Sequence, residues 1–453
     1  MNNLLLTFYG DDFTGSTDSM EALALGGLRV ALFLEPPRPE ELTGRFADLQ
    51  AVGVAGVSRS MTPAQMEDEL RPRFKQLKQL GAPLCHYKVC STFDSSPQIG
   101  SIGRATDIGH DIFKPPFVPL VVGAPVLKRY VAFGNLFATV GPETFRIDRH
   151  PTMSRHPVTP MDEGDLRLHL AKQTDKSIAL MDMLHLAGSD DEVDQRFQAL
   201  LQSRPDIVLF DTLDDSHLLK IGRLIWQQVG DKPVFIVGSS GVEYALTAYW
   251  QDINMVSKPE PFSPPGAVDQ LIVMSGSAAP TTAGQISWAM EHGFAGIRLD
   301  TVKLIDPDLA DTERAATIQK ALTTLGEGRD VILYSVHGPD DPAIEATNRR
   351  MEELGLGSSS IGQRLGKQQG QILRALLEKT GLRRACVAGG DTSGHSALQL
   401  GIYALEIVIP IAPGSPLCRA SSRQPKFDGL EISLKGGQNG QSNYFGQIKQ
   451  GKI

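Results

Sequence analysis

The sequence of 453 residues lacks most of the short motifs that reveal an activity directly. No segment matches the Walker A pattern Gly-x-x-x-x-Gly-Lys-[Ser/Thr] or the dinucleotide fingerprint Gly-x-Gly-x-x-Gly, which removes the usual support for a P-loop enzyme or a Rossmann oxidoreductase. There is also no His-Glu-x-x-His, no cluster of His and Cys, and no Gly-x-Ser-x-Gly elbow. These absences argue against zinc and serine hydrolases and leave metal ligands unassigned.

Cysteines, long apolar runs and excess positive charge are also scarce. The four cysteines include no Cys-x-x-Cys pair and fit a reducing compartment better than a disulfide framework. The apolar run 4–6 is followed at once by polar residues, unlike a secretory signal, and no apolar window approaches the roughly 18 residues of a membrane span. The net charge of -8 argues against nucleic acid. We therefore expect a cytoplasmic protein without membrane or nucleic-acid partners.

Short runs of Val, Ile and Leu alternate with amphipathic stretches along almost the whole chain. Such runs, separated by helices, are typical of parallel strands buried on both faces, so we predict an α/β fold with mostly parallel sheets. The expected strands are 4–8, 30–34, 51–57, 118–122, 178–181, 207–210, 234–237, 271–274, 296–299, 331–334, 385–388 and 407–411, with helices at 66–80, 192–202 and 361–377. Four prolines within residues 257–266 predict a connector between two domains, residues 1–256 and 257–453.

Residues 9–18, Tyr-Gly-Asp-Asp-Phe-Thr-Gly-Ser-Thr-Asp, follow the first expected strand directly. In open α/β sheets, ligands bind at the carboxyl ends of strands. Asp11 and Asp12 at such a place could bind a polyol, hold a metal or accept a hydroxyl proton. Turn chemistry explains the same residues, because Asp and Gly suit a strand–helix turn and Thr14 or Ser16 could cap the helix.

Glycine- and hydroxyl-rich loops also follow expected strands further along the chain. Residues 386–396 contain Gly-Gly-Asp-Thr, where backbone N–H groups at a helix N-terminus suit phosphate. Similar loops occur at residues 237–241, 273–277 and 434–440. Each alone is better explained as a structural turn, but several such loops can line one crevice. The residues alone predict an anion or nucleotide site and leave its ligand open.

Residues 86–96 are polar without much glycine. Lys88 within this segment could pair with a carboxylate or a phosphate. From the residues alone, a solvated lysine at a strand end is the favoured interpretation.

Two motifs together resemble those of the four-carbon acid sugar kinase family, long classified as a domain of unknown function: Gly-Asp-Asp-Phe-Thr-Gly at 10–15 and Gly-Gly-Asp-Thr-Ser-Gly at 389–394. The resemblance extends, in the family's order, to residues 238–241, 275–277, 412–419 and 434–437, and it covers nearly the whole chain. It implies an N-terminal domain that binds a sugar acid, a C-terminal domain that binds ATP, and reaction in a cleft between them. It also implies transfer of the γ-phosphoryl group to the terminal hydroxyl of the acid.

The resemblance implies roles for individual residues. Asp11 and Asp12 are the implied catalytic residues, one of which accepts the proton of the substrate hydroxyl or orients that hydroxyl. The implied substrate-binding residues are Thr14, Lys88, Ser91, Thr92 and Asp94. The implied ATP-binding residues are Ser277, Gly389, Gly390, Asp391, Thr392, Gly414 and Gly437, and Mg²⁺ is expected to accompany ATP.

One segment departs from the family pattern. Where many members read Lys-x-Asp-Ser-Thr-Leu-Arg-Gly, residues 88–95 read Lys-Val-Cys-Ser-Thr-Phe-Asp-Ser, so that Cys90 replaces the acid and Asp94 replaces the arginine. An anion in place of a cation near a carboxylate substrate should change specificity, since like charges repel. With these departures the sequence resembles a variant branch of the family that acts on 3-oxo-isoapionate, a branched sugar acid. This resemblance implies 3-oxo-isoapionate as the substrate, with 3-oxo-tetronate, D-threonate and D-erythronate as alternatives.

A non-catalytic function is the alternative of another class. Solute-binding proteins share the two-domain α/β architecture but are usually exported, and host-targeted effectors usually need a disordered export region, whereas here a core strand is expected from residue 4. Turnover that depends on ATP would separate the kinase from both. A homodimer is expected only because symmetric dimers are common among such enzymes.

Overall fold

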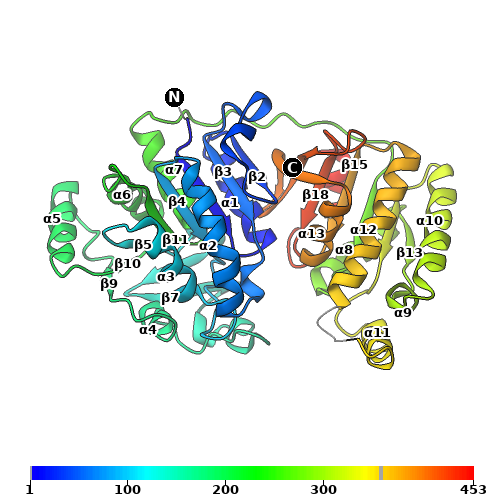
Figure 1. The fold of residues 1–453 in the computed structure, drawn as a ribbon, viewed down its shortest axis with the longest axis horizontal. Coiled ribbons are helices and arrows are strands. Elements are labelled where there is room, and N and C mark those ends of the chain that lie inside the picture. The colour runs from blue at the N-terminus through cyan, green and yellow to red at the C-terminus, as the bar shows by residue number, and fades with distance from the viewer. Residues whose placement is uncertain (1–2, 357–360, 453) are drawn as a thin grey trace. The chain divides into compact units, whose positions relative to one another are not determined.

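The computed structural model describes residues 3–356 and 361–452. The chain divides into two compact units, unit 1 (Met1–Glu260) and unit 2 (Pro261–Ile453), and the division falls within the proline-rich segment 257–266. Both units are α/β structures, as Figure 1 shows, which confirms the predicted fold class. Within the described part of the chain, no helix combines the length and the apolar character needed to cross a bilayer.

The main strands of unit 1 lie in the order β2-β3-β1-β4-β11-β5-β10-β9, and each is parallel to its neighbours. The central strands β1, β4 and β11 are buried along their whole length, as expected for parallel strands that are covered on both faces. The strand bounds are β1 Leu6–Gly10, β2 Val30–Phe33, β3 Ala51–Ala55, β4 Leu84–Lys88, β5 Val118–Val121, β9 Ile178–Met181, β10 Ile207–Phe210 and β11 Val234–Gly238.

The helices of unit 1 pack in two rows, α1 with α7 and α6, and α2 with α3 and α4. Their bounds are α1 Phe13–Leu25, α2 Pro63–Gln79, α3 Ile102–Phe113, α4 Leu166–Ala171, α5 Asp190–Leu201, α6 Asp215–Trp226 and α7 Gly241–Asp252, with the short 3₁₀ turn η3 Ser58–Ser60 after β3. A small antiparallel sheet of β6 Arg129–Ala132, β7 Asn135–Val140 and β8 Glu143–Arg146 lies between β5 and α4 in the sequence. The sequence patterns did not predict this small sheet.

The strands of unit 2 lie in the order β13-β14-β12-β15-β18-β17-β16, parallel from β13 to β18 and antiparallel from β18 to β16. The strand bounds are β12 Ile272–Ser275, β13 Ala295–Arg298, β14 Val331–Tyr334, β15 Arg384–Ala388, β16 Ile402–Ala412, β17 Ser415–Ser422 and β18 Glu431–Lys435. The helices are α8 Pro280–Glu291, α9 Thr301–Ile305, α10 Ala310–Gly326, α11 Pro342–Glu353, α12 Ile361–Thr380, α13 Gly390–Gln399 and α14 Tyr444–Gln450.

Two expectations about the strands need correction. The run 407–411 is part of β16, which is antiparallel to β17 because the tight turn at Pro413 and Gly414 reverses the chain. Strand β4, Leu84–Lys88, was not among the expected strands although it lies at the centre of the sheet. Its buried His86 and Lys88 interrupt the apolar run by which the other central strands were found.

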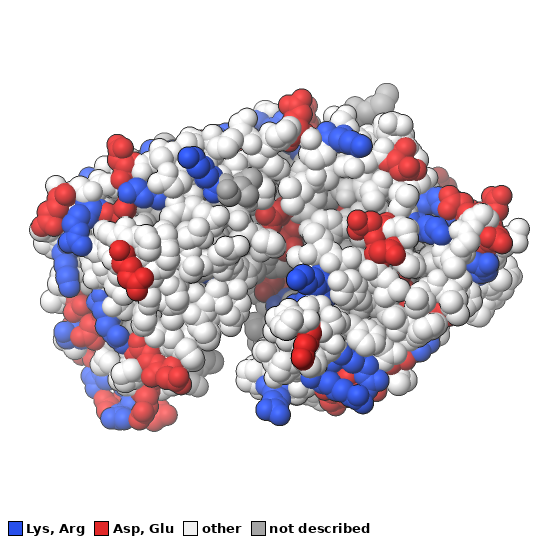
Figure 2. Space-filling view, turned by 180° about the vertical axis from the view of Figure 1, so that it is seen from behind, with Lys and Arg blue, Asp and Glu red and all other residues white. Residues whose placement is uncertain are grey.

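Charged residues of both signs are interspersed on the face shown in Figure 2. The net charge of -8 is therefore not gathered into one large acidic patch on that face. A field of a single sign over that surface is therefore not expected.

A buried His–Glu pair joins β4 to α7 in the core of unit 1. His86 Nε2 lies 3.1 Å from the carbonyl oxygen of Gly238, and its Nδ1 lies 2.7 Å from Glu243 Oε1. Both side chains are fully buried. Because the carbonyl oxygen can only accept, Nε2 carries one proton, and the bond to Glu243 requires a second proton on Nδ1 or on the carboxyl group. The pair therefore holds a proton inside the sheet.

Replacing His86 with leucine should destabilise unit 1 by about 3–5 kcal/mol, because it leaves Glu243 buried without its partner. Glu243→Gln should cost much less, because the amide can donate to Nδ1 without any ionised group. Urea denaturation of both variants, followed by circular dichroism, measures the difference. Equal stability of His86→Leu and the parent protein would contradict the role given to the pair.

Candidate functional site

The predicted acidic segment of unit 1 lies at the carboxyl ends of three neighbouring parallel strands. Asp11 and Asp12 follow β1, Arg59 lies in η3 after β3, and Lys88 is the last residue of β4. Strand β1 pairs with both β3 and β4, so the ends of these strands are adjacent. Four charged side chains from three separate parts of the sequence thereby meet at one edge of the sheet.

Arg59 bridges the two aspartates. Its Nη2 and Nε lie 2.9 and 3.2 Å from the carboxylate oxygens of Asp11, and its Nη1 lies 3.0 Å from Asp12 Oδ2. Burial alone would lower the pKa of Arg59, but Asp11 and Asp12 together with nearby acidic groups raise it well above its ordinary value. Sequence analysis missed Arg59, and the one available signal was its position just after an expected strand.

The two aspartates differ in environment. Burial raises the pKa of Asp11 to about 6, although the positive charge of Arg59 opposes the shift. Asp12 instead caps α1, since its Oδ1 accepts a hydrogen bond of 2.6 Å from the Gly15 N–H. The side chain of Asp12 is 31% exposed and that of Asp11 is 5% exposed. Asp12 is therefore the carboxylate that a solute can reach, and the alternative caps Thr14 and Ser16 are not used.

Lys88 is not a solvated lysine, which corrects the interpretation favoured from the residues alone. It is 1% exposed, and its Nζ lies 3.3 Å from Asp18 Oδ2 on α1. Burial lowers the pKa of Lys88, but Asp18 and the other nearby acidic groups outweigh this effect and keep the amine charged. A Cβ atom on Gly15 would lie 3.2 Å from Lys88 Nζ and 2.6 Å from Asp12 Oδ1. Glycine at position 15 thus leaves the space around these charges open, next to the partly exposed Thr14.

The segment after β4 contains Cys90 and Asp94, the two residues that differ from the family pattern, and it lies near Arg59. Thr92 Oγ1 donates a hydrogen bond of 2.5 Å to Asp94 Oδ1 and lies 3.0 Å from Cys90 Sγ. Cys90 and Asp94 both act electrostatically on Arg59, so they lie near the aspartate pair, and Ser91 lies in the same turn. The structure therefore brings these predicted residues together with Asp11 and Asp12.

In unit 2, three predicted loops meet at the carboxyl ends of the neighbouring strands β12, β15 and β18. The Gly276 N–H donates to the Ala388 carbonyl at 2.9 Å, and the Gly389 N–H donates to the Lys435 carbonyl at 2.9 Å. These bonds tie the loop after β12 to β15 and the loop after β15 to β18. Loops that are far apart in the sequence therefore form one continuous backbone surface.

Glycine is required where these loops touch. A Cβ atom on Gly276 would lie 2.0 Å from Thr392 Oγ1, and one on Gly437 would lie 2.3 Å from Ser277 Oγ. Gly389 has a φ of +117°, a conformation that side chains other than glycine rarely adopt, and it caps the N-terminus of α13. Free N–H groups at a helix start are suited to phosphate oxygens.

The remaining predicted nucleotide residues border these loops. Gly390 and Asp391 form the first turn of α13 and are exposed. Gly414 lies in the β16–β17 turn with a φ of +69°, and Asn439 Nδ2 donates to the neighbouring Pro413 carbonyl at 3.0 Å. This bond joins the late glycine turn to the Gly414 turn. Among residues 3–356 and 361–452, no three His, Cys, Asp or Glu side chains gather as a metal-binding group.

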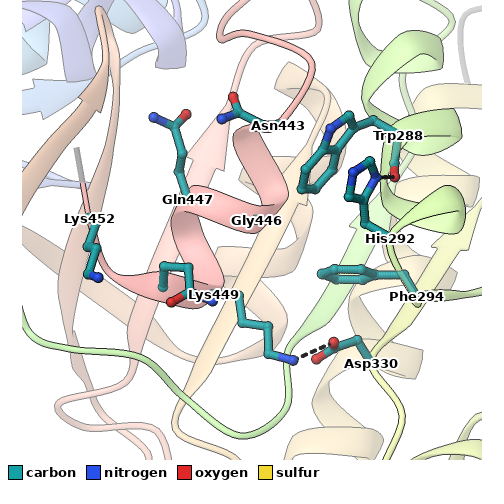
Figure 3. Close-up of a pocket in the computed structure, with 10 residues that line it drawn as sticks. Trp288, His292, Phe294, Asp330, Asn443, Gly446, Gln447, Lys449 and Lys452 are labelled. Carbon is teal, nitrogen blue, oxygen red and sulfur yellow. Dashed lines mark hydrogen bonds and ion pairs between the residues drawn. The ribbon is translucent and has the colours of Figure 1, made fainter.

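A separate pocket of about 410 Å³ in unit 2 contains none of the predicted site residues. Figure 3 shows Trp288 stacked on His292, and Lys449 paired with Asp330 at 2.7 Å. Asp330 directly precedes β14, so the pocket lies at the amino end of that strand. The phosphate-suited loops lie at the carboxyl ends, so this pocket is not the predicted nucleotide site.

Comparisons with known proteins match both units. Residues 6–246 match a family model described as a sugar-binding N-terminal domain, and residues 272–445 match one described as a nucleotide-binding C-terminal domain. The chain is 46% identical over 450 residues to a protein of Paraburkholderia graminis named 3-oxo-isoapionate kinase, covering 99% of this chain and 95% of the relative. It is 28% identical to a Pseudomonas savastanoi pv. phaseolicola protein named 3-oxo-tetronate kinase, covering 98% of this chain and 97% of the relative.

Solved structures share the fold. A Salmonella typhimurium LT2 protein has a TM-score of 0.78 at 23% identity, covering 99% of each chain. A Haemophilus influenzae protein of the DUF1537 family has a TM-score of 0.74 at 22% identity, covering 98% of this chain and 99% of its own. The two family models together span most of the sequence, in the order that the motifs predict. The chain therefore belongs to the four-carbon acid sugar kinase family, in which a sugar-binding N-terminal domain precedes a nucleotide-binding C-terminal domain.

Proposed function

We propose that this protein is an ATP-dependent kinase that phosphorylates the terminal hydroxyl of 3-oxo-isoapionate to give 3-oxo-isoapionate 4-phosphate. The observation that carries the proposal is the full-length, 46% identical relative that bears the name 3-oxo-isoapionate kinase. The second candidate substrate is 3-oxo-tetronate, which is favoured by several relatives at about 26–28% identity. D-Threonate and D-erythronate are further alternatives.

In this proposal, unit 1 binds and activates the acceptor. Asp12 is the catalytic residue that accepts the proton of the substrate hydroxyl or orients that hydroxyl, because its carboxylate is the more exposed of the pair. Asp11 holds Arg59 through two hydrogen bonds. Arg59 and Lys88 offset the negative charges of Asp11, Asp12 and Asp18, which reduces the repulsion that an anionic sugar acid would meet there.

Unit 2 binds the phosphoryl donor at the three joined loops. The N–H groups of Gly389 to Thr392 at the start of α13, with Ser277 and Gly437 facing each other, suit the phosphate chain of ATP. Mg²⁺ is usually held by the nucleotide phosphates and one or two carboxylates, and Asp391 is the carboxylate that these loops offer. When bound, Mg²⁺ neutralises charge on the phosphate oxygens. The protein's own part is to position the phosphates and the acceptor.

ADP release in the presence of Mg²⁺ and ATP, measured across four- and five-carbon sugar acids and their 3-oxo forms, tests the function. Turnover should be highest with 3-oxo-isoapionate. Absence of ADP release with every acid would overturn the proposed activity, and absence of ATP binding would also overturn the nucleotide site.

The two aspartates should give different kinetic defects. We expect Asp12→Asn to lower kcat by about 10²–10⁴-fold, the usual contribution of a positioned acid or base. The kcat/KM of the parent enzyme should fall as the pH is lowered through about 6, because protonation of Asp11 weakens its pairing with Arg59. This acidic limb should be absent from the residual activity of Asp11→Asn. Full activity of Asp12→Asn, with the fold retained, would contradict the assigned role.

Cys90 and Asp94, which differ from the family pattern, should control substrate choice. The double variant Cys90→Asp and Asp94→Arg, which restores the family pattern, should raise kcat/KM for 3-oxo-tetronate relative to 3-oxo-isoapionate by roughly tenfold or more. Both single variants serve as controls. Asp94→Arg alone places a second arginine near Arg59 without the new acid at position 90. An unchanged substrate ratio in the double variant would show that specificity is set elsewhere.

A side chain at Gly276 should block the nucleotide loops. In Gly276→Ala the new Cβ would lie 2.0 Å from Thr392 Oγ1, so the loops after β12 and β15 must separate. We expect the Kd for ATP to rise by at least about tenfold, measured by calorimetry. Gly326→Ala at the end of α10 is the matched control, since its Cβ meets no atom within 4 Å. Equal affinity in both variants would argue against nucleotide binding at these loops.

A further inference from the structure

Lys435 is a buried lysine that the proposed chemistry does not yet use. It is the last residue of β18 and directly precedes the glycine turn that contains Gly437. Its side chain is 0% exposed. Lysines are almost never fully buried unless they are paired, so this position calls for a partner or a function.

Lys435 connects three parts of the nucleotide site. Its carbonyl oxygen accepts the N–H of Gly389, which starts the turn before α13. Its Nζ donates a hydrogen bond of 3.2 Å to Thr282 Oγ1 on α8, and that hydroxyl donates to the Gly437 carbonyl at 2.6 Å. The amine thus supports the hydroxyl that fixes the glycine turn.

A second residue of α8 completes this support. Gln285 Nε2 lies 2.9, 3.1 and 3.0 Å from the carbonyl oxygens of Asn439, Gly440 and Gln441. The turn is therefore held from α8 by side-chain hydrogen bonds to its carbonyls. Three consecutive carbonyl groups of the turn are thereby fixed to one helix.

The charge of Lys435 has no compensating carboxylate. Throughout residues 3–356 and 361–452, no acidic side chain forms an ion pair with its Nζ, which lies 5.6 Å from the centre of the Tyr444 ring on α14. The groups that face it are Thr282 on α8, Tyr444 on α14 and the thiol of Cys386 on β15. Burial lowers the pKa of Lys435 to about 8, and Cys386 opposes this shift.

We propose that Lys435 is a positioning residue for the nucleotide, whose ammonium group braces the Gly437 turn through Thr282 and whose charge is compensated by the bound phosphates. The inference rests on the proposed function, because it takes ATP as the ligand of these loops. Because the ammonium group is fully buried, water screens its charge less than in bulk solution, and its attraction to a phosphate bound at these loops is correspondingly stronger. The nucleotide would then supply the anion that the protein itself does not provide.

This arrangement couples nucleotide binding to a proton. In the free protein the buried amine is partly neutral near pH 8. A bound anion favours the charged form, so it raises the pKa of Lys435 and binding takes up a proton. Binding should therefore take up a fraction of a proton per nucleotide at a pH near the pKa of Lys435, and affinity should decrease as the pH rises through that pKa.

Calorimetric titration of the full-length protein with MgADP at pH 8, in buffers of different ionisation enthalpy, measures the proton uptake directly. Lys435→Met should weaken MgADP binding on the order of tenfold and abolish the uptake. Lys435→Arg keeps the charge without titrating in this range, so it should retain most of the affinity and also show no uptake. Lys379→Met, which removes an exposed lysine of α12, is the matched control and should behave like the parent protein.

The outcomes separate this inference from the proposed function. MgADP binding without proton uptake, or with unchanged Kd and uptake in Lys435→Met, would overturn the role of Lys435 and leave the nucleotide site standing. No MgADP binding by the parent protein would overturn both. If Lys435→Met fails to fold, as judged by its thermal unfolding, Lys435→Arg and the parent protein still decide the matter, because equal proton uptake in the two would contradict the inference.

Discussion

The ion pairs that Arg59 makes with Asp11 and Asp12 are the interaction on which the proposed acceptor site depends. Two adjacent carboxylates at the end of one strand repel each other, and burial makes ionisation of Asp11 more costly. The guanidinium group offsets both effects and fixes the direction of each carboxylate. Asp12 is then held by Arg59 on one oxygen and by the N-terminus of α1 on the other. A carboxylate that is fixed in this way suits a role in orienting a substrate hydroxyl.

The two units use the same feature of parallel sheets for different ligands. In unit 1, the strand ends bring together charged side chains, whereas in unit 2 they bring together backbone N–H groups and glycines. Close contact between Gly276 and Thr392, and between Gly437 and Ser277, leaves no room for a Cβ atom. The first arrangement suits a small polar anion with hydroxyl groups, and the second suits a phosphate chain.

Buried charge recurs at both sites and is balanced differently in each. Lys88 has Asp18 as a partner within the protein, and its amine stays charged. Lys435 has no such partner among the described residues, and its pKa is lowered to about 8. A lysine that is paired by the protein contributes mainly to the shape of its site, whereas an unpaired one can respond to the charge of a ligand.

The α/β class, most of the strands and the motif-bearing loops could be predicted from the sequence, because buried parallel strands read as unbroken apolar runs and glycine turns follow them. Strand β4 could not, since His86 and Lys88 interrupt its apolar pattern, and their ion-pair partners Glu243 and Asp18 lie elsewhere in the sequence. The antiparallel order of β16 was also hidden, because an apolar run does not reveal its direction.

The candidate sites show the same limit. The sequence by itself determined which residue types follow each strand, and the resemblance gave their implied roles. Only the tertiary structure placed Arg59 between the two aspartates, buried Lys88, and joined Lys435 to the glycine turn through Thr282. These contacts depend on which strands are neighbours and on how far each side chain is removed from water, and local sequence patterns encode neither.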